Sequence, residues 1–195
     1  LLQKIMEQSH IILEVLDARF VEETRNKEIE KEILEKNKKI LYVINKSDLN
    51  LDLRREDIPV PNVVVSCKGR KGIKNLRDRI KIMASGMNKN EEGKILVGVI
   101  GYPNTGKSSL INILIGKGSA GTGDDAGFTK GIQKLKLSSE ITLLDSPGVI
   151  PTKEYSPENF KIVGKNTKLG ARSYSQIKIP EQAVDELIFE FPGLL

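Results

Sequence analysis

Short runs of apolar, mostly β-branched residues recur along the chain and are typical of strands buried in a parallel sheet. These runs lie at 11–16, 40–44, 63–65, 95–100 and 141–144. Residues 132–137 alternate between apolar and polar side chains, which predicts a half-exposed edge strand. Motifs with candidate chemistry follow the buried runs. Because ligands bind at the carboxyl ends of the strands in an open α/β sheet, we expect the functional residues there.

In several segments between these strands, and again near the C-terminus, apolar residues recur at the spacing of a helix. Residues 87–94 are polar and indicate a linker, whereas residues 116–127 are so rich in Gly, Ser and Asp that we expect a mobile loop. The helices are expected at 26–39, at 73–83, from Lys107 to about residue 115, and at 180–191.

The order of these elements predicts an α/β fold over residues 1–150, with a mostly parallel sheet flanked by helices. A short tail over 151–195 is expected to end in the amphipathic helix. The chain has 195 residues, of which 38% are hydrophobic, so it can bury a real core. Its single cysteine excludes an internal disulfide framework, and no apolar run is long enough to span a bilayer. We therefore expect a cytoplasmic protein that does not contact the membrane.

Residues 101–108 read Gly-Tyr-Pro-Asn-Thr-Gly-Lys-Ser, which fits the phosphate-binding pattern G-x-x-x-x-G-K-[ST]. The glycines let the backbone N–H groups point inward, and the following helix adds its positive N-terminal end. Lys107 would neutralise the β- and γ-phosphates, and the Ser108 hydroxyl would ligate Mg²⁺. A simple strand-to-helix turn is the plainer alternative. The expected phosphate contacts are Tyr102, Pro103, Asn104, Thr105, Gly106, Lys107, Ser108 and Ser109.

Two polar loops have the chemistry to recognise guanine. Asn45-Lys46-Ser47-Asp48 fits N-K-x-D, in which the Asp48 carboxylate can accept hydrogen bonds from the N1–H and 2-amino groups of the base. Adenine offers no such pair of donors, so the motif also discriminates between bases. Asn45 would brace the loop, and the stem of Lys46 would lie over the purine. In Ser66-Cys67-Lys68, the backbone N–H of Cys67 could reach guanine O6.

The remaining phosphate chemistry is expected after the last buried strand. Asp145-Ser146-Pro147-Gly148 fits D-x-x-G, in which Asp145 would hold Mg²⁺ through water and the Gly148 N–H would reach the γ-phosphate. Thr129, in Gly-Phe-Thr-Lys-Gly at 127–131, could close over Mg²⁺ and the γ-phosphate. The predicted metal ligands are therefore Ser108, Thr129 and Asp145.

Taken together, these motifs resemble a GTPase whose order is rotated, because N-K-x-D and S-x-K precede the P-loop, the threonine and D-x-x-G. That order is similar to the circularly permuted GTPases. With the Asp17-Ala18-Arg19 ending of the first strand, the set resembles the branch that acts in assembly of the large ribosomal subunit. The resemblance covers roughly residues 5–190 and implies GTP and GDP as ligands, Mg²⁺ as cofactor, and the large subunit or its rRNA as partner. A monomer is expected.

The resemblance also implies how hydrolysis would be assisted. Val149 stands where many GTPases have a glutamine that orients water, so we expect slow intrinsic turnover that the ribosomal partner stimulates. Asn104 occupies the P-loop position that coordinates K⁺ in similar GTPases, so K⁺ is a second candidate cofactor. The predicted catalytic residues are Lys107, Thr129 and Asn104.

Two features have plainer interpretations beside functional ones. His10, the sole histidine, precedes the first strand, so a surface or capping role is favoured over catalysis. Eight basic residues and one acid between positions 68 and 89 fit either contact with an rRNA backbone or a solvated helix face.

Three functions are compatible with this pattern. A GTPase switch in ribosome assembly is favoured by Lys107, Ser108 and Asp145. A scaffold that binds RNA or the ribosome with negligible turnover is favoured by the missing glutamine after Gly148. A GTPase acting on tRNA or in translation is disfavoured by the permuted motif order.

The tail follows D-x-x-G directly, so we expect the nucleotide state to order residues 149–168 and to reposition the helix at 180–191. A static packing helix is the alternative.

Overall fold

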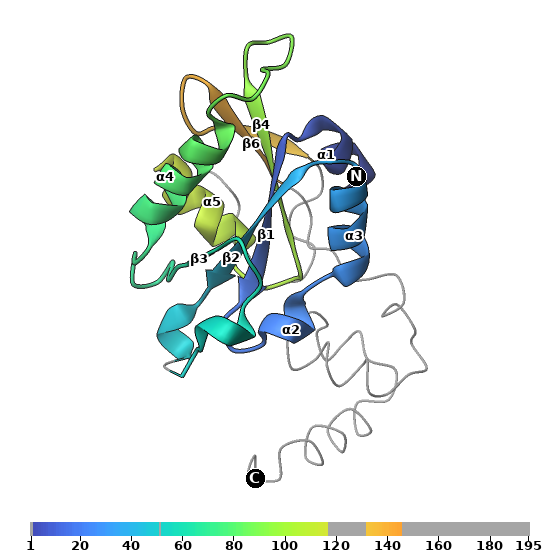
Figure 1. The fold of residues 1–195 in the computed structure, drawn as a ribbon. Helices are drawn as coiled ribbons and strands as arrows, with labels where there is room; N and C mark the ends of the chain where they lie inside the picture. The colour runs from blue at the N-terminus through green and yellow to red at the C-terminus, as the bar shows by residue number, and fades with distance from the viewer. Residues whose placement is uncertain (1, 51, 117–131, 146–195) are drawn as a thin grey trace, which may run out of the picture.

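The computed structural model describes residues 2–50, 52–116 and 132–145, and Figure 1 shows their arrangement. The strands are β1 (Ile11–Asp17), β2 (Lys39–Asn45), β3 (Asn62–Val64), β4 (Ile95–Gly101), β5 (Gln133–Lys136) and β6 (Ile141–Asp145). The helices are α1 (Leu2–Gln8), α2 (Val21–Thr24), α3 (Lys27–Glu35), α4 (Ile73–Ala84) and α5 (Lys107–Ile115), with short 3-10 turns η1 (Ser47–Leu49) and η2 (Arg55–Asp57).

Within the described ranges, the strands form one sheet in the order β3-β2-β1-β4-β6-β5. All neighbours are parallel except β5, which runs antiparallel to β6 at the edge. The predicted mostly parallel sheet is therefore confirmed, as is the edge position of the alternating strand. β1 lies between β2 and β4, and all its residues are buried. The carboxyl ends of β1, β2 and β4 thus lie side by side.

Helices cover both faces of this sheet, and each face has its own apolar cluster. One cluster includes Leu76 of α4 and Leu110 of α5, together with Leu13 and Val15 of β1. The other joins α1, α2 and α3 to the opposite side, with Ile12 of β1 among its members. In Figure 1, α4 and α5 lie on one side of the sheet, and α1 and α3 lie on the other. The alternation of β1 side chains therefore builds both halves of the core.

Gly98, in the middle of β4, lets α1 pack directly against the sheet. A Cβ atom at this position would lie 2.6 Å from the Ser9 hydroxyl oxygen and 2.7 Å from a methyl carbon of Ile5. Ile5 is fully buried. A side chain at residue 98 would thus push α1 away from the core.

His10 caps backbone at the end of the sheet opposite the strand carboxyl ends. The ring Nδ1 of His10 accepts a hydrogen bond from the Leu96 backbone N–H at 3.0 Å. The backbone N–H of His10 donates to the Leu96 carbonyl at 2.8 Å. The capping role favoured by the sequence is confirmed.

Two of the eight basic side chains between residues 68 and 89 make contacts within the fold. Arg77 donates to the carbonyls of Ile113 and Leu114, at 2.9 and 2.7 Å, and so satisfies the C-terminal end of α5. Lys89 forms an ion pair with Glu140. The other six cations are exposed: Lys68, Arg70, Lys71, Lys74, Arg79 and Lys81.

Several sequence-based boundaries differ from the structure. The helix expected over 26–39 is shorter, because Asn26 is its N-cap and accepts a hydrogen bond from the Ile29 N–H at 3.2 Å. It ends at Glu35. Helices α1 and α2 were not predicted. The tail at 151–195, its helix at 180–191, and residues 117–127 of the expected mobile loop lie outside the described residues. In the part of the chain that is described, no helix combines the length and apolar character needed to cross a membrane.

A buried carboxyl group on β1 should make stability depend on pH. Glu14 accepts a hydrogen bond from the Asn26 N–H at 2.9 Å and lies beside Glu30, which binds Arg25 and the Tyr42 hydroxyl. Burial, and then the charge of Glu30, raise the pKa of Glu14 to about 8. The folded chain therefore keeps a proton that the unfolded chain loses near its ordinary pKa of 4.5. Stability from this group is present below that value and is lost as pH rises through about 8.

We expect Glu14→Gln to raise the free energy of unfolding by roughly 1–3 kcal/mol at about pH 9, with the gain vanishing near pH 5. Urea unfolding at several pH values measures this difference. The exposed Glu91→Gln variant is the control and should follow wild type. Parallel pH curves for Glu14→Gln and wild type would contradict the expectation.

Candidate nucleotide-binding site

The turn between β4 and α5 has a backbone that requires glycine at two positions. Gly101 has a φ of 150°, and an added Cβ would lie 2.4 Å from the Val15 carbonyl oxygen. Gly106 has a φ of 92°, and an added Cβ would lie 2.3 Å from the Asn45 side-chain nitrogen. Gly106 also precedes the first residue of α5, so the helix N-terminus opens directly onto the loop. This is the geometry expected of an anion-binding strand-loop-helix unit.

Lys107, the first residue of α5, folds back over this loop. Its Nζ donates to the carbonyls of Gly101 and Tyr102, at 3.1 and 2.9 Å, and the side chain is buried. Burial lowers the pKa of Lys107 to about 8, although the negative charge of Asp145 opposes this shift. In the structure, the Lys107 ammonium is hydrogen-bonded to two neutral carbonyls. A phosphate group that reached the loop would give it an anionic partner.

Asn45 connects the guanine motif to the P-loop. Its side-chain nitrogen donates to the Thr105 carbonyl at 2.9 Å, and its Oδ1 accepts a hydrogen bond from the Cys67 N–H at 3.2 Å. The same amide therefore touches all three loops. The Cys67 N–H, which the sequence assigned to guanine O6, would have to share or exchange this hydrogen bond. Burial raises the pKa of the Cys67 thiol to about 11, so the side chain is a protonated packing group.

Asp48 is exposed and is oriented by Ser66. The Ser66 hydroxyl donates to Asp48 Oδ1 at 2.5 Å and accepts from the Gly69 N–H at 2.8 Å. This hydrogen bond is the main cause that lowers the pKa of Asp48 below its ordinary value. Ser66 thus holds an ionised, accessible carboxylate, and Lys68 adds a nearby positive charge.

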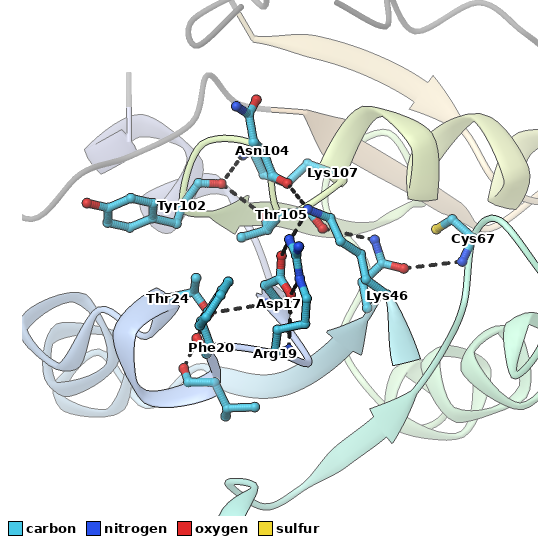
Figure 2. Close-up of polar contacts among 12 residues, drawn as sticks. Asp17, Arg19, Phe20, Thr24, Lys46, Cys67, Tyr102, Asn104, Thr105 and Lys107 are labelled. Atoms are coloured by element: carbon cyan, nitrogen blue, oxygen red, sulfur yellow. Dashed lines mark hydrogen bonds and ion pairs between the residues drawn. The ribbon is translucent and has the colours of Figure 1, made fainter. Parts of the chain in front are cut away.

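Lys46 bridges the guanine motif and the P-loop, as Figure 2 shows. Its backbone is left-handed, with a φ of 61°. Its Nζ donates to the Asn104 carbonyl at 2.6 Å and forms an ion pair with Asp17 at 2.9 Å. The stem of Lys46 is consequently fixed at both ends.

The predicted Mg²⁺ ligands fall partly within the described residues. Ser108 lies in the first turn of α5, and Asp145 is a buried residue at the end of β6. The β4–β6 pairing sets Asp145 opposite Val99, two residues before Gly101. A hydroxyl and a carboxylate suit Mg²⁺, and no cluster of three or more acidic, histidine or cysteine ligands occurs among the described residues. Phosphate and water oxygens would therefore have to complete the coordination. Thr129 and Gly148 lie outside the described residues.

The other predicted phosphate contacts lie in or beside the same turn. Tyr102, Pro103 and Thr105 are buried, and the Thr105 hydroxyl donates to the Tyr102 carbonyl at 2.9 Å. Asn104 has a left-handed backbone with a φ of 59°. Ser109, in the first turn of α5, is half-buried.

From the sequence, Asp17 and Arg19 were expected only at the ligand-facing end of the first strand, as part of the resemblance, and the structure shows the contacts that they make there (Figure 2). Asp17 ends β1 directly opposite Asn45 of β2, and its carboxylate contacts Arg19 and Lys46. A signal was present, because polar residues that end adjacent parallel strands lie at the same edge of the sheet. The order of the strands was needed to use it.

Comparisons with known proteins agree with this geometry. Residues 96–181 match the family model described as 50S ribosome-binding GTPase. An uncharacterized GTP-binding protein of Methanocaldococcus jannaschii is 48% identical over 158 residues, covering 79% of this chain and 42% of that protein. The GTPase grn1 of Schizosaccharomyces pombe is 32% identical over 225 residues, covering 99% of this chain and 47% of that protein. The chain thus spans less than half the length of these relatives.

A solved structure shares the fold. GNP-bound YlqF from T. maritima superposes with a TM-score of 0.64 at 20% identity, covering 97% of this chain and 72% of that one. In the present chain, the guanine motif follows β2 and therefore precedes the P-loop, which follows β4. Residues 96–181 thus match the model of the 50S ribosome-binding GTPases, and the chain has a P-loop GTPase fold in which the guanine motif comes before the phosphate loop.

Proposed function

We propose that this chain hydrolyses GTP and acts as a switch in assembly of the large ribosomal subunit. The observation that carries the proposal is Asn45, which joins the base-recognition motif to the phosphate loop through the Thr105 carbonyl and to the third loop through Cys67. Base and phosphate recognition are thus part of one site. The description of the matching family supports a ribosomal partner.

In this proposal, Lys107 neutralises charge on the β- and γ-phosphates, and the N–H groups of the P-loop orient them. Ser108 and Asp145 would hold Mg²⁺, which supplies further charge stabilisation when bound. Asp48 fixes the base, with Ser66 holding its carboxylate. Thr129 and Gly148 are proposed to sense the γ-phosphate.

Co-sedimentation with large ribosomal subunits from the same cell tests the switch. We expect more protein to sediment with a non-hydrolysable GTP analogue than with GDP, and we expect subunits to stimulate GTP turnover. Equal sedimentation in both nucleotide states would contradict a switch. Sedimentation without measurable turnover would instead support an RNA-binding scaffold.

We also propose that K⁺ assists hydrolysis through Asn104. Asn104 has a left-handed backbone conformation within the P-loop, with a φ of 59°. Its backbone carbonyl accepts a hydrogen bond from Lys46 Nζ. A cation beside the phosphates would supply the charge that Val149 cannot. We expect turnover in K⁺ to exceed that in Na⁺ by roughly tenfold or more, and we expect Asn104→Ala to remove the difference. Equal rates in the two salts, measured by phosphate release, would overturn this role.

A further inference from the structure

We propose that Asp17 is a positioning residue for guanine recognition, because it fixes the Lys46 side chain before the nucleotide binds. The inference rests on the GTP-binding site described above and gives a role to a residue to which the sequence analysis assigned no contact. Asp17 is the last residue of β1, is only 3% exposed, and pairs in register with Asn45. It therefore enters the site from the strand next to the one that carries N-K-x-D.

The Asp17 carboxylate uses both oxygens to hold two cations. Its Oδ2 contacts Lys46 Nζ at 2.9 Å and an Arg19 terminal nitrogen at 2.7 Å. Its Oδ1 accepts from the Arg19 backbone N–H and Nε, both at 3.0 Å. Burial alone would raise the pKa of Asp17, but the hydrogen bonds from Arg19 and Lys46 lower it below the ordinary value. The group is thus a fixed anion at neutral pH.

This anion restrains a side chain that would otherwise sample many rotamers. Lys46 Nζ lies between the Asp17 carboxylate and the Asn104 carbonyl, and Figure 2 shows the lysine extended toward both. A free lysine would lose its rotamer freedom when the purine packs on its stem. Because Asp17 and Asn104 have already fixed Nζ, that cost falls on folding rather than on binding.

Arg19 completes the arrangement on the exposed side. Its guanidinium carbon lies over the Phe20 ring, 5.1 Å from the ring centre. Its Nε and one terminal nitrogen donate to the two carboxylate oxygens of Asp17. Its charge also contributes to lowering the pKa of Asp48, so it lies within electrostatic reach of the guanine-binding carboxylate. Asp17 thereby holds two cations close together and offsets the repulsion between them.

A double-mutant cycle tests whether Asp17 acts through Lys46. GDP affinity is measured by calorimetry for wild type, Asp17→Asn, Lys46→Met and the double variant. Methionine keeps an apolar stem and removes Nζ. We expect Asp17→Asn to weaken GDP binding roughly tenfold in the wild-type background and to have no further effect beside Lys46→Met.

Additive losses in the cycle would overturn the inference, because a residue that only supports the fold would weaken binding in both backgrounds. The exposed Asp78→Asn variant on α4 is the matched control and should bind like wild type. If Asp17→Asn fails to fold, the same cycle with Asp17→Glu, which keeps the charge but moves it, decides the question. Failure of wild type to bind GDP would instead refute the nucleotide site itself.

Discussion

Asp48→Asn is expected to change base preference from guanine to xanthine. The wild-type carboxylate can accept from both the N1–H and the 2-amino group of guanine, whereas asparagine presents an amide donor to one of them. Xanthine carries a carbonyl in place of the 2-amino group, so it accepts from that amide. We expect GTP affinity to fall at least a hundredfold and XTP affinity to rise above it, as measured by competition for a fluorescent nucleotide.

The structure makes this substitution a clean test of specificity. Asp48 is exposed, and the Ser66 hydroxyl can still donate to the asparagine carbonyl, so the loop should keep its conformation. Asp52→Asn, at an exposed position in the loop that follows, is the control and should leave base preference unchanged. ATP binding as tight as GTP binding in wild type would show that Asp48 does not select the base.

Lys107→Met should separate nucleotide binding from stability. The Lys107 ammonium is buried against the Gly101 and Tyr102 carbonyls, and burial has lowered its pKa to about 8. A methionine fills similar volume without a buried charge, so we expect the nucleotide-free protein to unfold at the same or about 1–2 kcal/mol higher free energy. GTP affinity should nevertheless fall at least a hundredfold, because the phosphates lose their buried cation. A variant that is clearly destabilised, or that binds GTP normally, would contradict this view of Lys107.

The same lysine predicts opposite pH dependences for folding and for binding. Phosphate binds the protonated form, so GTP affinity should be level below about pH 8 and fall at higher pH. The unfolded chain keeps its proton up to the ordinary value of 10.5, so the contribution of Lys107 to stability rises between those two values. Lys107→Arg stays charged throughout this range and is the control for the titration. Wild-type affinity that does not change with pH would indicate a lysine that is not desolvated.

Most of the sheet and the phosphate loop were predictable because their signals are local. Apolar runs mark buried strands, and the two glycines of the P-loop occupy positions where a Cβ would clash or the backbone is left-handed. Helix α2 has four residues and no side-chain N-cap, so no periodicity could reveal it. Glu14 lies in an apolar run and gives no sign in the sequence that it is buried beside another acid.

The contacts that the sequence could not provide are those between strands. Asp17 and Lys46 are 29 residues apart, and they meet because β1 and β2 are parallel neighbours in register. The hydrogen bond from Cys67 to Asn45 depends likewise on β3 lying beside β2. Residue types indicated which chemistry was available. Strand order decided which groups could touch.

During synthesis the chain emerges from its N-terminal side, so β1, β2 and β3 are complete before β4 exists. The strand at the centre of the finished sheet is then an edge, with apolar residues unpaired on one side until residues 95–101 arrive. Such an edge can pair with other chains. The loops proposed to recognise the base are therefore made first, and β4 both pairs with the exposed edge of β1 and delivers the phosphate loop. A nascent chain therefore cannot present both loops to a nucleotide before β4 has paired with β1.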